Sequence, residues 1–251
     1  MQESEERGGS TARPEEVAKF DRLAARWWDP AGPMAPLHRM NPVRVGWIAE
    51  RLARAHGRDP AALEALRGLA VLDVGCGAGL AAEALARRGA AVTGLDAAGE
   101  ALEAARAHAA AAGLAVDYRA GAPEDLLPAA AGRFDAVLAL EVIEHVTERA
   151  AFLRHLAQLA RPDGGLVILS TLNRTARSFL VAKLGAEYLL RWLPPGTHDW
   201  RLFVTPAELG AALRAAGLRV TDLAGMRYDP LGGRFRIARD VGVNYILAAV
   251  R

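Results

Sequence analysis

The chain has a single cysteine, no long apolar run and no large excess of either charge. Cys76 is the only cysteine among 251 residues, so an internal disulfide is excluded and a reducing compartment is favoured. No apolar run reaches the roughly 20 residues needed to cross a bilayer. The first residues are acidic and polar, so we expect no secretory signal and a cytoplasmic location.

Charge of either sign is nearly balanced. Lys and Arg number 31 against 29 Asp and Glu, which gives a net charge of +2, and the pI near 9.0 reflects only a small arginine excess. This balance gives no sign of a nucleic-acid partner. The hydrophobic content of 52% suffices for a sizeable core, and the length fits one α/β domain with additions.

The chain does contain a distinctive glycine turn within Val71–Gly79. The apolar β-branched run at its start predicts a strand, the alternate glycines Gly75, Gly77 and Gly79 predict a tight turn, and the Ala/Leu pattern that follows predicts a helix. Glycine is required where backbone approaches a ligand closely, because a Cβ would occupy the ligand's place. About twenty residues further on, the next apolar run ends in Asp96, where a carboxylate can accept hydrogen bonds from both hydroxyls of a ribose.

Two classes of cofactor use such a turn, and the glycine spacing separates them. A dinucleotide turn needs Gly-x-Gly-x-x-Gly, whereas here Leu80 stands at the sixth position. The spacing Gly-x-Gly-x-Gly, with Asp73 two residues before the first glycine, looks like the S-adenosylmethionine loop of class I methyltransferases. A carboxylate is favourable beside the sulfonium and amino groups of that cofactor. We therefore favour a methyltransferase over a dehydrogenase; a purely structural turn is the remaining alternative.

Strands and helices alternate regularly after this turn. The alternation predicts an α/β fold with a doubly wound, mostly parallel sheet of seven strands, as in Rossmann-like class I methyltransferases. Ligands belong at the carboxyl edge of such a sheet, which places Gly75, Asp96, Leu140 and Glu141 along one edge. The expected strands cover residues 71–74, 91–95, 115–119, 134–140, 166–171, 218–225 and 242–250, and the expected helices 80–88, 100–112, 148–160 and 206–216.

Segments outside this alternation extend the domain. Residues 1–13 are expected to be a disordered tail, and residues 14–251 a single methyltransferase domain. Within it, residues 14–68 are expected to form an N-terminal helical cap. Residues 173–204 are an insertion after the fifth strand, and their position over the active-site edge predicts a lid over the substrate.

The cap contains two features of interest. Arg44 lies one turn into a helix expected over residues 41–55, with Asn41 as its N-cap. Its guanidinium either hydrogen-bonds the carboxylate of a bound amino-acid moiety or remains an ordinary solvated group. The adjacent pair Trp27 and Trp28 is either a flap packed on the main domain or a cover over cofactor and substrate.

An acidic cluster follows the fourth expected strand. If a helical turn begins there, Glu141, Glu144 and His145 share one face at positions i, i+3 and i+4. Three such ligands suit a divalent cation, and the carboxylates suit Mg²⁺. In the alternative interpretation, the acidic residues complement a helix dipole and the histidine is packed.

A methyl acceptor must become nucleophilic before transfer. A phenol with a pKa near ~10 is protonated at neutral pH, so a base must remove the proton or a metal must lower the pKa of a chelating diol. The candidate catalytic residues are His145, His198 and Glu141. Transfer is then an in-line displacement at the sulfonium methyl, for which the enzyme supplies alignment and excludes water.

Several further segments are more specific than a fold signature. They are Arg26–Asp29, Pro36–Arg39, Asn41–Arg44, Val71–Gly79, Glu141–His145, Ser170–Arg174, Gly185–Tyr188, Gly196–Asp199 and Val243–Tyr245. With these segments the chain strongly resembles the ubiquinone-biosynthesis O-methyltransferase family over about residues 15 to 250.

The resemblance implies both a reaction and a set of site residues. The reaction is methylation of polyprenylated catechols by S-adenosylmethionine, on a 2-polyprenyl-6-hydroxyphenol and on 3-demethylubiquinol. The residues implied to bind the cofactor are Arg44, Gly75, Asp96 and Leu140. In eukaryotic relatives the Glu-x-x-Glu-His cluster is a divalent-metal site.

Two departures from the family pattern concern the nucleoside end of the cofactor site. Leu140 stands where relatives often have Met, a tolerable apolar exchange. Many class I methyltransferases have an acidic residue directly after the third strand, whereas here residues 121–123 intervene before Glu124. The side chain that meets the adenine amine is therefore left open.

A polyprenyl substrate lies in the bilayer, which suggests a second role for the insertion at residues 173–204, namely contact with the membrane. Residues 174–193 combine basic residues with an apolar face of leucines and aromatics, and such a helix can lie in an anionic membrane surface. A lid helix packed on its own domain is the alternative. The expected partners are a polyprenyl catechol, the inner face of the cytoplasmic membrane and other ubiquinone-biosynthesis enzymes, without nucleic acid. A non-catalytic S-adenosylmethionine-binding scaffold, or an enzyme with another small acceptor, are the competing functions.

Overall fold

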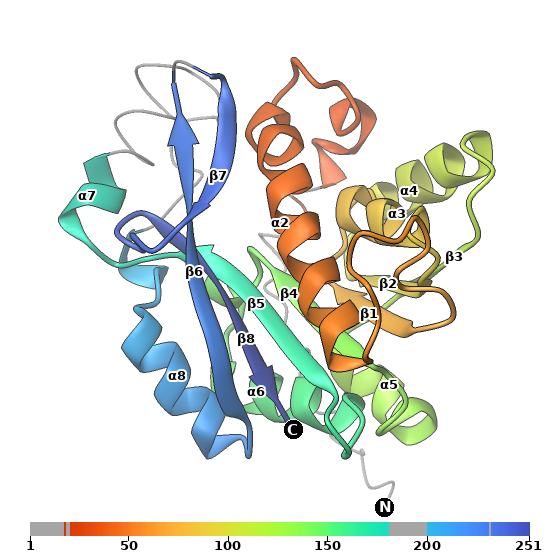
Figure 1. Cartoon of the computed structure of the whole chain (residues 1–251). Coiled ribbons are helices and arrows are strands. Elements are labelled where there is room, and N and C mark those ends of the chain that lie inside the picture. The colour runs from red at the N-terminus through yellow and green to blue at the C-terminus, as the bar shows by residue number, and fades with distance from the viewer. Residues whose placement is uncertain (1–17, 19–20, 181–199, 231) are drawn as a thin grey trace, which may run out of the picture.

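A single mixed β-sheet forms the centre of the computed structural model, which describes residues 18, 21–180, 200–230 and 232–251 (Figure 1). The eight strands lie in the order β3-β2-β1-β4-β5-β8-β6-β7. The pairs among β1 to β5 are parallel, and the pairs of β8 with β5 and β6 and of β6 with β7 are antiparallel. The strands are β1 (Ala70–Val74), β2 (Ala91–Asp96), β3 (Val116–Ala120), β4 (Ala136–Leu140), β5 (Leu166–Leu172), β6 (Arg219–Asp229), β7 (Arg234–Ala238) and β8 (Asn244–Val250).

Helices cover both faces of the sheet, as the strand–helix alternation predicted. The described α-helices are α2 (Ala35–Ala55), α3 (Leu80–Ala86), α4 (Gly99–Ala111), α5 (Pro123–Ala130), α6 (Arg149–Leu159), α7 (Ala176–Ser178) and α8 (Pro206–Ala215). The short 3₁₀ turns are η1 (Ala24–Arg26), η2 (Ile143–His145) and η4 (Trp200–Leu202).

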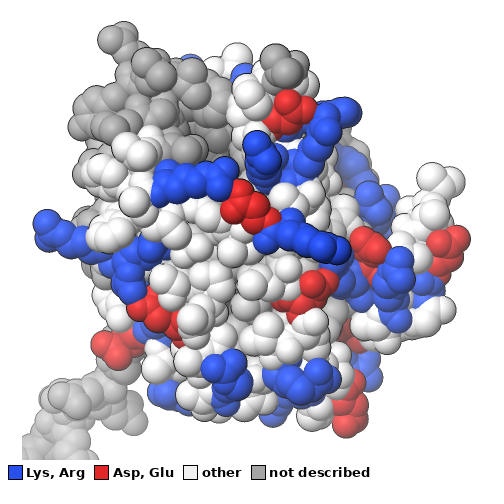
Figure 2. Space-filling model, turned by 60° about the vertical axis from the view of Figure 1, so that its left-hand side comes forward, with Lys and Arg blue, Asp and Glu red and all other residues white. Residues whose placement is uncertain are grey.

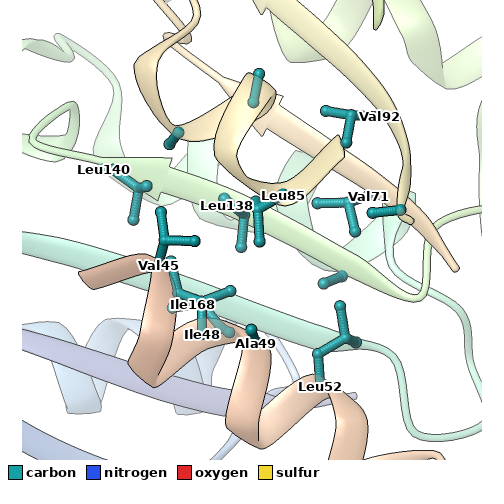
Figure 3. Close-up of a cluster of buried hydrophobic side chains, with 14 of the residues drawn as sticks. Val45, Ile48, Ala49, Leu52, Val71, Leu85, Val92, Leu138, Leu140 and Ile168 are labelled. Carbon is teal, nitrogen blue, oxygen red and sulfur yellow. The ribbon is translucent and has the colours of Figure 1, made fainter. Parts of the chain in front are cut away.

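The two faces bury separate hydrophobic cores. On one face α2 packs its apolar side on the sheet, with Ile48 and Leu52 fully buried near Leu138 and Ile168 (Figure 3). The opposite core lies under α5, α6 and α8 and includes Phe152. Because consecutive strand residues point to opposite faces, each central strand contributes to both cores. The carboxyl ends of the parallel strands are thereby fixed along one edge.

The α/β class and the mostly parallel sheet are confirmed, but in the ranges that the structure describes the sheet has eight strands and not the predicted seven. The additional strand is β7, which pairs with β6 through residues such as Phe235 and Tyr228, whose rings lie 5.2 Å apart. Its sequence alternates arginines with apolar residues, the pattern of a strand with one covered face. The predicted 242–250 strand begins only at Asn244.

Two local predictions were wrong. Helix α2 begins at Ala35, so Asn41 lies inside it and is not its N-cap. Helix α5 is absent from the expected set; it begins at Pro123, where Asp125 turns back to accept a 2.8 Å hydrogen bond from the backbone N–H of Ala122.

Some predictions lie wholly or partly outside the described residues. These include the tail 1–13, most of the lid 173–204 and His198. The domain limits therefore stay predictions. Among the helices that the structure describes, none is long and apolar enough to span a membrane.

Candidate functional site

The glycine turn lies between the end of β1 and the start of α3. Gly75, Gly77 and Gly79 all have positive φ, at 69°, 53° and 88°, a region that side chains other than glycine rarely adopt. Space adds a second constraint. A Cβ on Gly77 would overlap the indole of Trp27, and one on Gly79 would overlap the hydroxyl of Tyr118. Backbone conformation and nearby protein side chains therefore both require glycine here, and the predicted approach of a ligand to this turn stays a prediction.

Asp96 stands at the tip of β2, where the sequence placed it. Its two carboxylate oxygens accept hydrogen bonds from the backbone N–H groups of Gly77, at 2.7 Å, and Ala98, at 2.8 Å. Burial raises the pKa of Asp96, and these two hydrogen bonds oppose the rise. A carboxylate has about four acceptor positions, so both oxygens keep capacity for ribose hydroxyls.

Asp73 and Arg44 form a buried pair of unlike charge beside the turn. Asp73 comes from β1 and is 2% exposed, and Arg44 comes from α2 and is 4% exposed. Burial raises the pKa of Asp73 to about 7, and the charge of Arg44 opposes this rise. Burial also lowers the pKa of Arg44.

This pair has unused hydrogen-bonding capacity. Oδ2 of Asp73 and both Nε and Nη1 of Arg44 lack hydrogen-bond partners. Buried polar atoms are rarely left unsatisfied. A ligand with an amino group for Asp73 and a carboxylate for Arg44 would satisfy them. The residues therefore fit the methionine end of S-adenosylmethionine.

Glu141 has an unusual backbone conformation directly after Leu140, the last residue of β4. In the described part of the chain it is the only residue other than glycine with positive φ, at 59°. Such conformations are strained and cluster at functional sites. Its Oε1 lies 4.0 Å from Nη1 of Arg44 and accepts a 2.8 Å hydrogen bond from Oγ of Ser170. Glu141 therefore lies beside the Asp73–Arg44 pair.

The pKa of Glu141 is raised to about 7. Burial is the largest cause, and the nearby charge of Glu144 adds to it. Arg44 and the hydrogen bond from Ser170 act in the opposite direction. A carboxyl group with such a pKa exchanges its proton near neutral pH.

Glu144 and His145 do not join Glu141 on one helical face, contrary to the sequence prediction. The turn η2 is 3₁₀ and begins only at Ile143. The carboxylate of Glu144 is bound elsewhere, because it accepts a 2.9 Å hydrogen bond from Oγ1 of Thr171.

The strand beneath the two carboxylates explains this separation. Ser170 and Thr171 are consecutive residues of β5, so their side chains point to opposite faces of the sheet. They hold Glu141 and Glu144 in different directions. Within the ranges that the structure describes, no three His, Cys, Asp or Glu side chains are grouped to hold a metal ion. Glu141 and Glu144 are held by different hydroxyls of β5, and the metal role predicted for Glu141, Glu144 and His145 stays a prediction.

Two residues position the site in ways that the sequence patterns do not predict. Ser170 belongs to one of the family-specific segments, and its hydroxyl, at the carboxyl end of a strand, contacts the neighbouring acidic turn. Asn41 was assigned to a helix end, whereas its Nδ2 donates a 2.8 Å hydrogen bond to the carbonyl of Leu80, the first residue of α3. It thereby joins the helix that carries Arg44 to the glycine turn.

Sequence comparisons agree with this geometry. Residues 72–168 match the family model of a methyltransferase domain. The chain is 54% identical over 248 residues to the ubiquinone biosynthesis O-methyltransferase of Methylobacterium nodulans, covering 99% of this chain and 98% of that protein. It is 53% identical over 238 residues to the protein of the same name from Azorhizobium caulinodans, covering 95% and 93%.

Solved structures show the same fold. The magnesium protoporphyrin IX methyltransferase of Synechocystis, solved with bound SAH (S-adenosylhomocysteine), aligns with a TM-score of 0.61 at 27% identity and covers 93% of this chain and 94% of that one. A SAM-dependent methyltransferase from Aquifex aeolicus aligns with a TM-score of 0.61 at 18% identity, over 93% and 97%.

Proposed function

The chain belongs to the ubiquinone biosynthesis O-methyltransferase family, and from this we propose that it methylates ring hydroxyls of polyprenylated catechols, namely a 2-polyprenyl-6-hydroxyphenol and 3-demethylubiquinol. It is an S-adenosylmethionine-dependent methyltransferase. The observation that carries the proposal is the buried pair Asp73 and Arg44, with unsatisfied polar atoms, directly beside Glu141.

The cofactor roles follow from the chemistry of the side chains. Arg44 binds the carboxylate of the methionine moiety and Asp73 its amino group, because each then gains a partner of opposite charge. Asp96 accepts hydrogen bonds from the ribose hydroxyls. Leu140 provides an apolar contact for the nucleoside, and the three glycines of the turn allow its backbone to approach the cofactor. The cofactor supplies an electrophilic methyl group on a sulfonium.

The acceptor hydroxyl needs a base, and Glu141 is the candidate that the geometry supports best. Its strained backbone fixes the carboxylate near Arg44, and its pKa of about 7 suits proton exchange at neutral pH. The phenolic proton passes to Glu141. The phenolate oxygen then forms a bond to the methyl carbon while the carbon–sulfur bond breaks, and the sulfur leaves as a neutral thioether. His145 and His198 remain the other candidate bases.

Docking to a membrane surface is a further part of the proposal, because a polyprenyl acceptor partitions into lipid. Leu180 is 55% exposed after α7. Arg174 is paired with Glu208, and Nη1 of Arg177 lies 2.6 Å from Oδ2 of Asp240. Figure 2 shows basic side chains interspersed with acidic ones on one face of the molecule. The rest of the expected basic helix, residues 181–193, lies outside the described ranges.

Charge reversal tests the membrane step. We expect the triple substitution of Arg174, Arg177 and Arg191 by Glu to abolish flotation with vesicles containing phosphatidylglycerol. The matched control reverses three arginines far from this segment, Arg54, Arg67 and Arg133. Unchanged flotation of the first variant contradicts membrane docking and leaves the reaction unaffected.

A methyl-transfer assay tests the reaction itself. Labelled S-adenosylmethionine and a short-chain demethylubiquinol are incubated with the protein, and methylated product is the expected result. Binding of SAH without any transfer would indicate a non-catalytic scaffold. A parallel arm adds EDTA and then Mg²⁺. If EDTA abolishes the activity and Mg²⁺ restores it, Glu141, Glu144 and His145 are assigned to a metal site. If EDTA does not change the activity, Glu141 remains the proposed base.

A further inference from the structure

A series of side-chain contacts joins α3 and α4 to the N-terminal cap. Glu83 in α3 is fully buried, and its carboxylate accepts hydrogen bonds of 2.8 Å from Arg87 and from Nδ1 of His108 in α4. The ring of His108 stacks on the indole of Trp28, with centroids 3.4 Å apart and planes 4° from parallel. A buried carboxylate therefore fixes the orientation of a ring on which the cap rests.

The same tryptophan pair contacts consecutive residues of the glycine turn. Nε1 of Trp28 donates a 3.0 Å hydrogen bond to the carbonyl of Ala78. Trp27 is 6% exposed, and its ring lies where a Cβ of Gly77 would be. The carbonyl of Trp27 is held by Nε2 of His38 at 2.8 Å. The position of the cap and the conformation of the turn are thus linked.

None of the roles assigned above uses Glu83, His108 or Trp28. Burying a carboxylate costs free energy unless the carboxylate is paired. Apolar side chains would therefore pack α3 against α4 without the cost that Glu83 brings. The polar pairing instead determines how the ring of His108 is turned. In that orientation the ring lies flat against the indole of Trp28.

We propose that His108 is a positioning residue for cofactor binding, which acts through Trp28 to hold the cap against Gly77 and Ala78. Docking of the cap and binding of S-adenosylmethionine are then coupled, and the coupling acts in both directions. The proposal rests on the cofactor role of the glycine turn. It requires no contact between His108 and the cofactor.

Binding and kinetics of matched variants test this coupling. Aromatic pairs contribute roughly threefold to tenfold in an equilibrium constant, so His108→Ala should weaken SAH binding and raise the KM for S-adenosylmethionine by about that factor. We expect kcat and the KM for the acceptor to stay close to wild type. His108→Phe keeps a ring on Trp28 but loses the hydrogen bond to Glu83 that orients it, so it should recover only part of the affinity. His155→Ala in α6 is the control, because its Nδ1 also faces a glutamate, Oε2 of Glu124 at 3.5 Å.

Hydrogen exchange provides the reciprocal measurement. SAH should slow amide exchange at residues 24–28 in the wild type and slow it less in His108→Ala. Equal SAH affinity of His108→Ala and wild type would overturn the proposal. If His108→Ala fails to fold by circular dichroism, Trp28→Phe decides, because it keeps a ring on His108 but loses the donor to Ala78. Wild-type affinity in that variant overturns the proposal as well. Failure of the wild type itself to bind SAH would instead contradict the cofactor site.

Discussion

Ser170 holds Glu141 at two points. Its hydroxyl donates a 2.8 Å hydrogen bond to Oε1 of Glu141, and its carbonyl accepts a 2.9 Å hydrogen bond from the backbone N–H of the same residue. The left-handed backbone of Glu141 is therefore stabilised by the neighbouring strand. One residue of β5 fixes both the conformation and the carboxylate of the proposed base.

Ser170→Ala should lower kcat about tenfold, because a hydrogen bond to a charged group is worth roughly 1.5–3 kcal/mol. In the wild type this hydrogen bond lowers the pKa of Glu141. Its loss should therefore raise that pKa and move the acidic limb of the kcat/KM profile to higher pH. Thr221→Ala, which removes a hydroxyl bonded to the carbonyl of Ala248 and not to Glu141, should leave this limb in place. An unchanged acidic limb in Ser170→Ala would contradict the role of Glu141 as base.

Local patterns were sufficient for much of the fold. The glycine turn and the regular alternation predicted the parallel strands and the helices between them, because both signals are short-range. Strand β7 was missed since its arginines made residues 234–238 resemble a polar connection. The start of α2 was missed because prolines at 36 and 42 suggested a boundary, whereas Pro36 lies in the first turn, where proline is tolerated.

The site was predictable only in part, for a related reason. Asp96 ends β2, Glu141 follows β4, and Asp73 is the last residue but one of β1, so topology alone places them along one edge. Which hydroxyl of β5 holds Glu141 and which holds Glu144 depends on the pairing of β4 with β5. Pairing between distant segments, and the positive φ of Glu141, leave no local mark in the sequence.

Arg44→Lys should raise the KM for S-adenosylmethionine about tenfold or more with a smaller effect on kcat. Lysine keeps the charge but loses the planar pair of donors that matches a carboxylate. Arg51→Lys, two turns further along α2, is the matched control, because Arg51 pairs with Asp222 at 2.6 Å. Equal KM values for the Arg44 variant and the wild type would mean that Arg44 does not bind the cofactor's carboxylate.

Gly77→Ala should destabilise the fold and abolish SAH binding, since the new Cβ meets both an unfavourable φ of 53° and the ring of Trp27. Gly57→Ala separates the two causes. Gly57 has a similar φ of 65°, but no atom lies within 4 Å of the place of its Cβ. We expect Gly57→Ala to cost about 1–2 kcal/mol in the free energy of unfolding without changing SAH affinity. Similar losses in both variants would show that close approach at Gly77 adds nothing.

Asp73→Asn should change how stability depends on pH. The pKa of Asp73 is about 7 in the folded protein against an ordinary value of 3.8. Between these values the folded protein keeps a proton that the unfolded chain has released, so the free energy of unfolding of the wild type falls as the pH rises. The favourable contribution is complete below about pH 4 and is lost by about pH 7.

The free energy of unfolding of Asp73→Asn does not contain this decrease. In urea unfolding without cofactor, the stability of the variant relative to the wild type should therefore rise between about pH 4 and pH 7 and stay constant above pH 7. Glu141 titrates in both proteins, so the difference between them isolates Asp73. If the stability curves of the two proteins run parallel from pH 4 to pH 8, Asp73 is ionised throughout this range and burial does not raise its pKa.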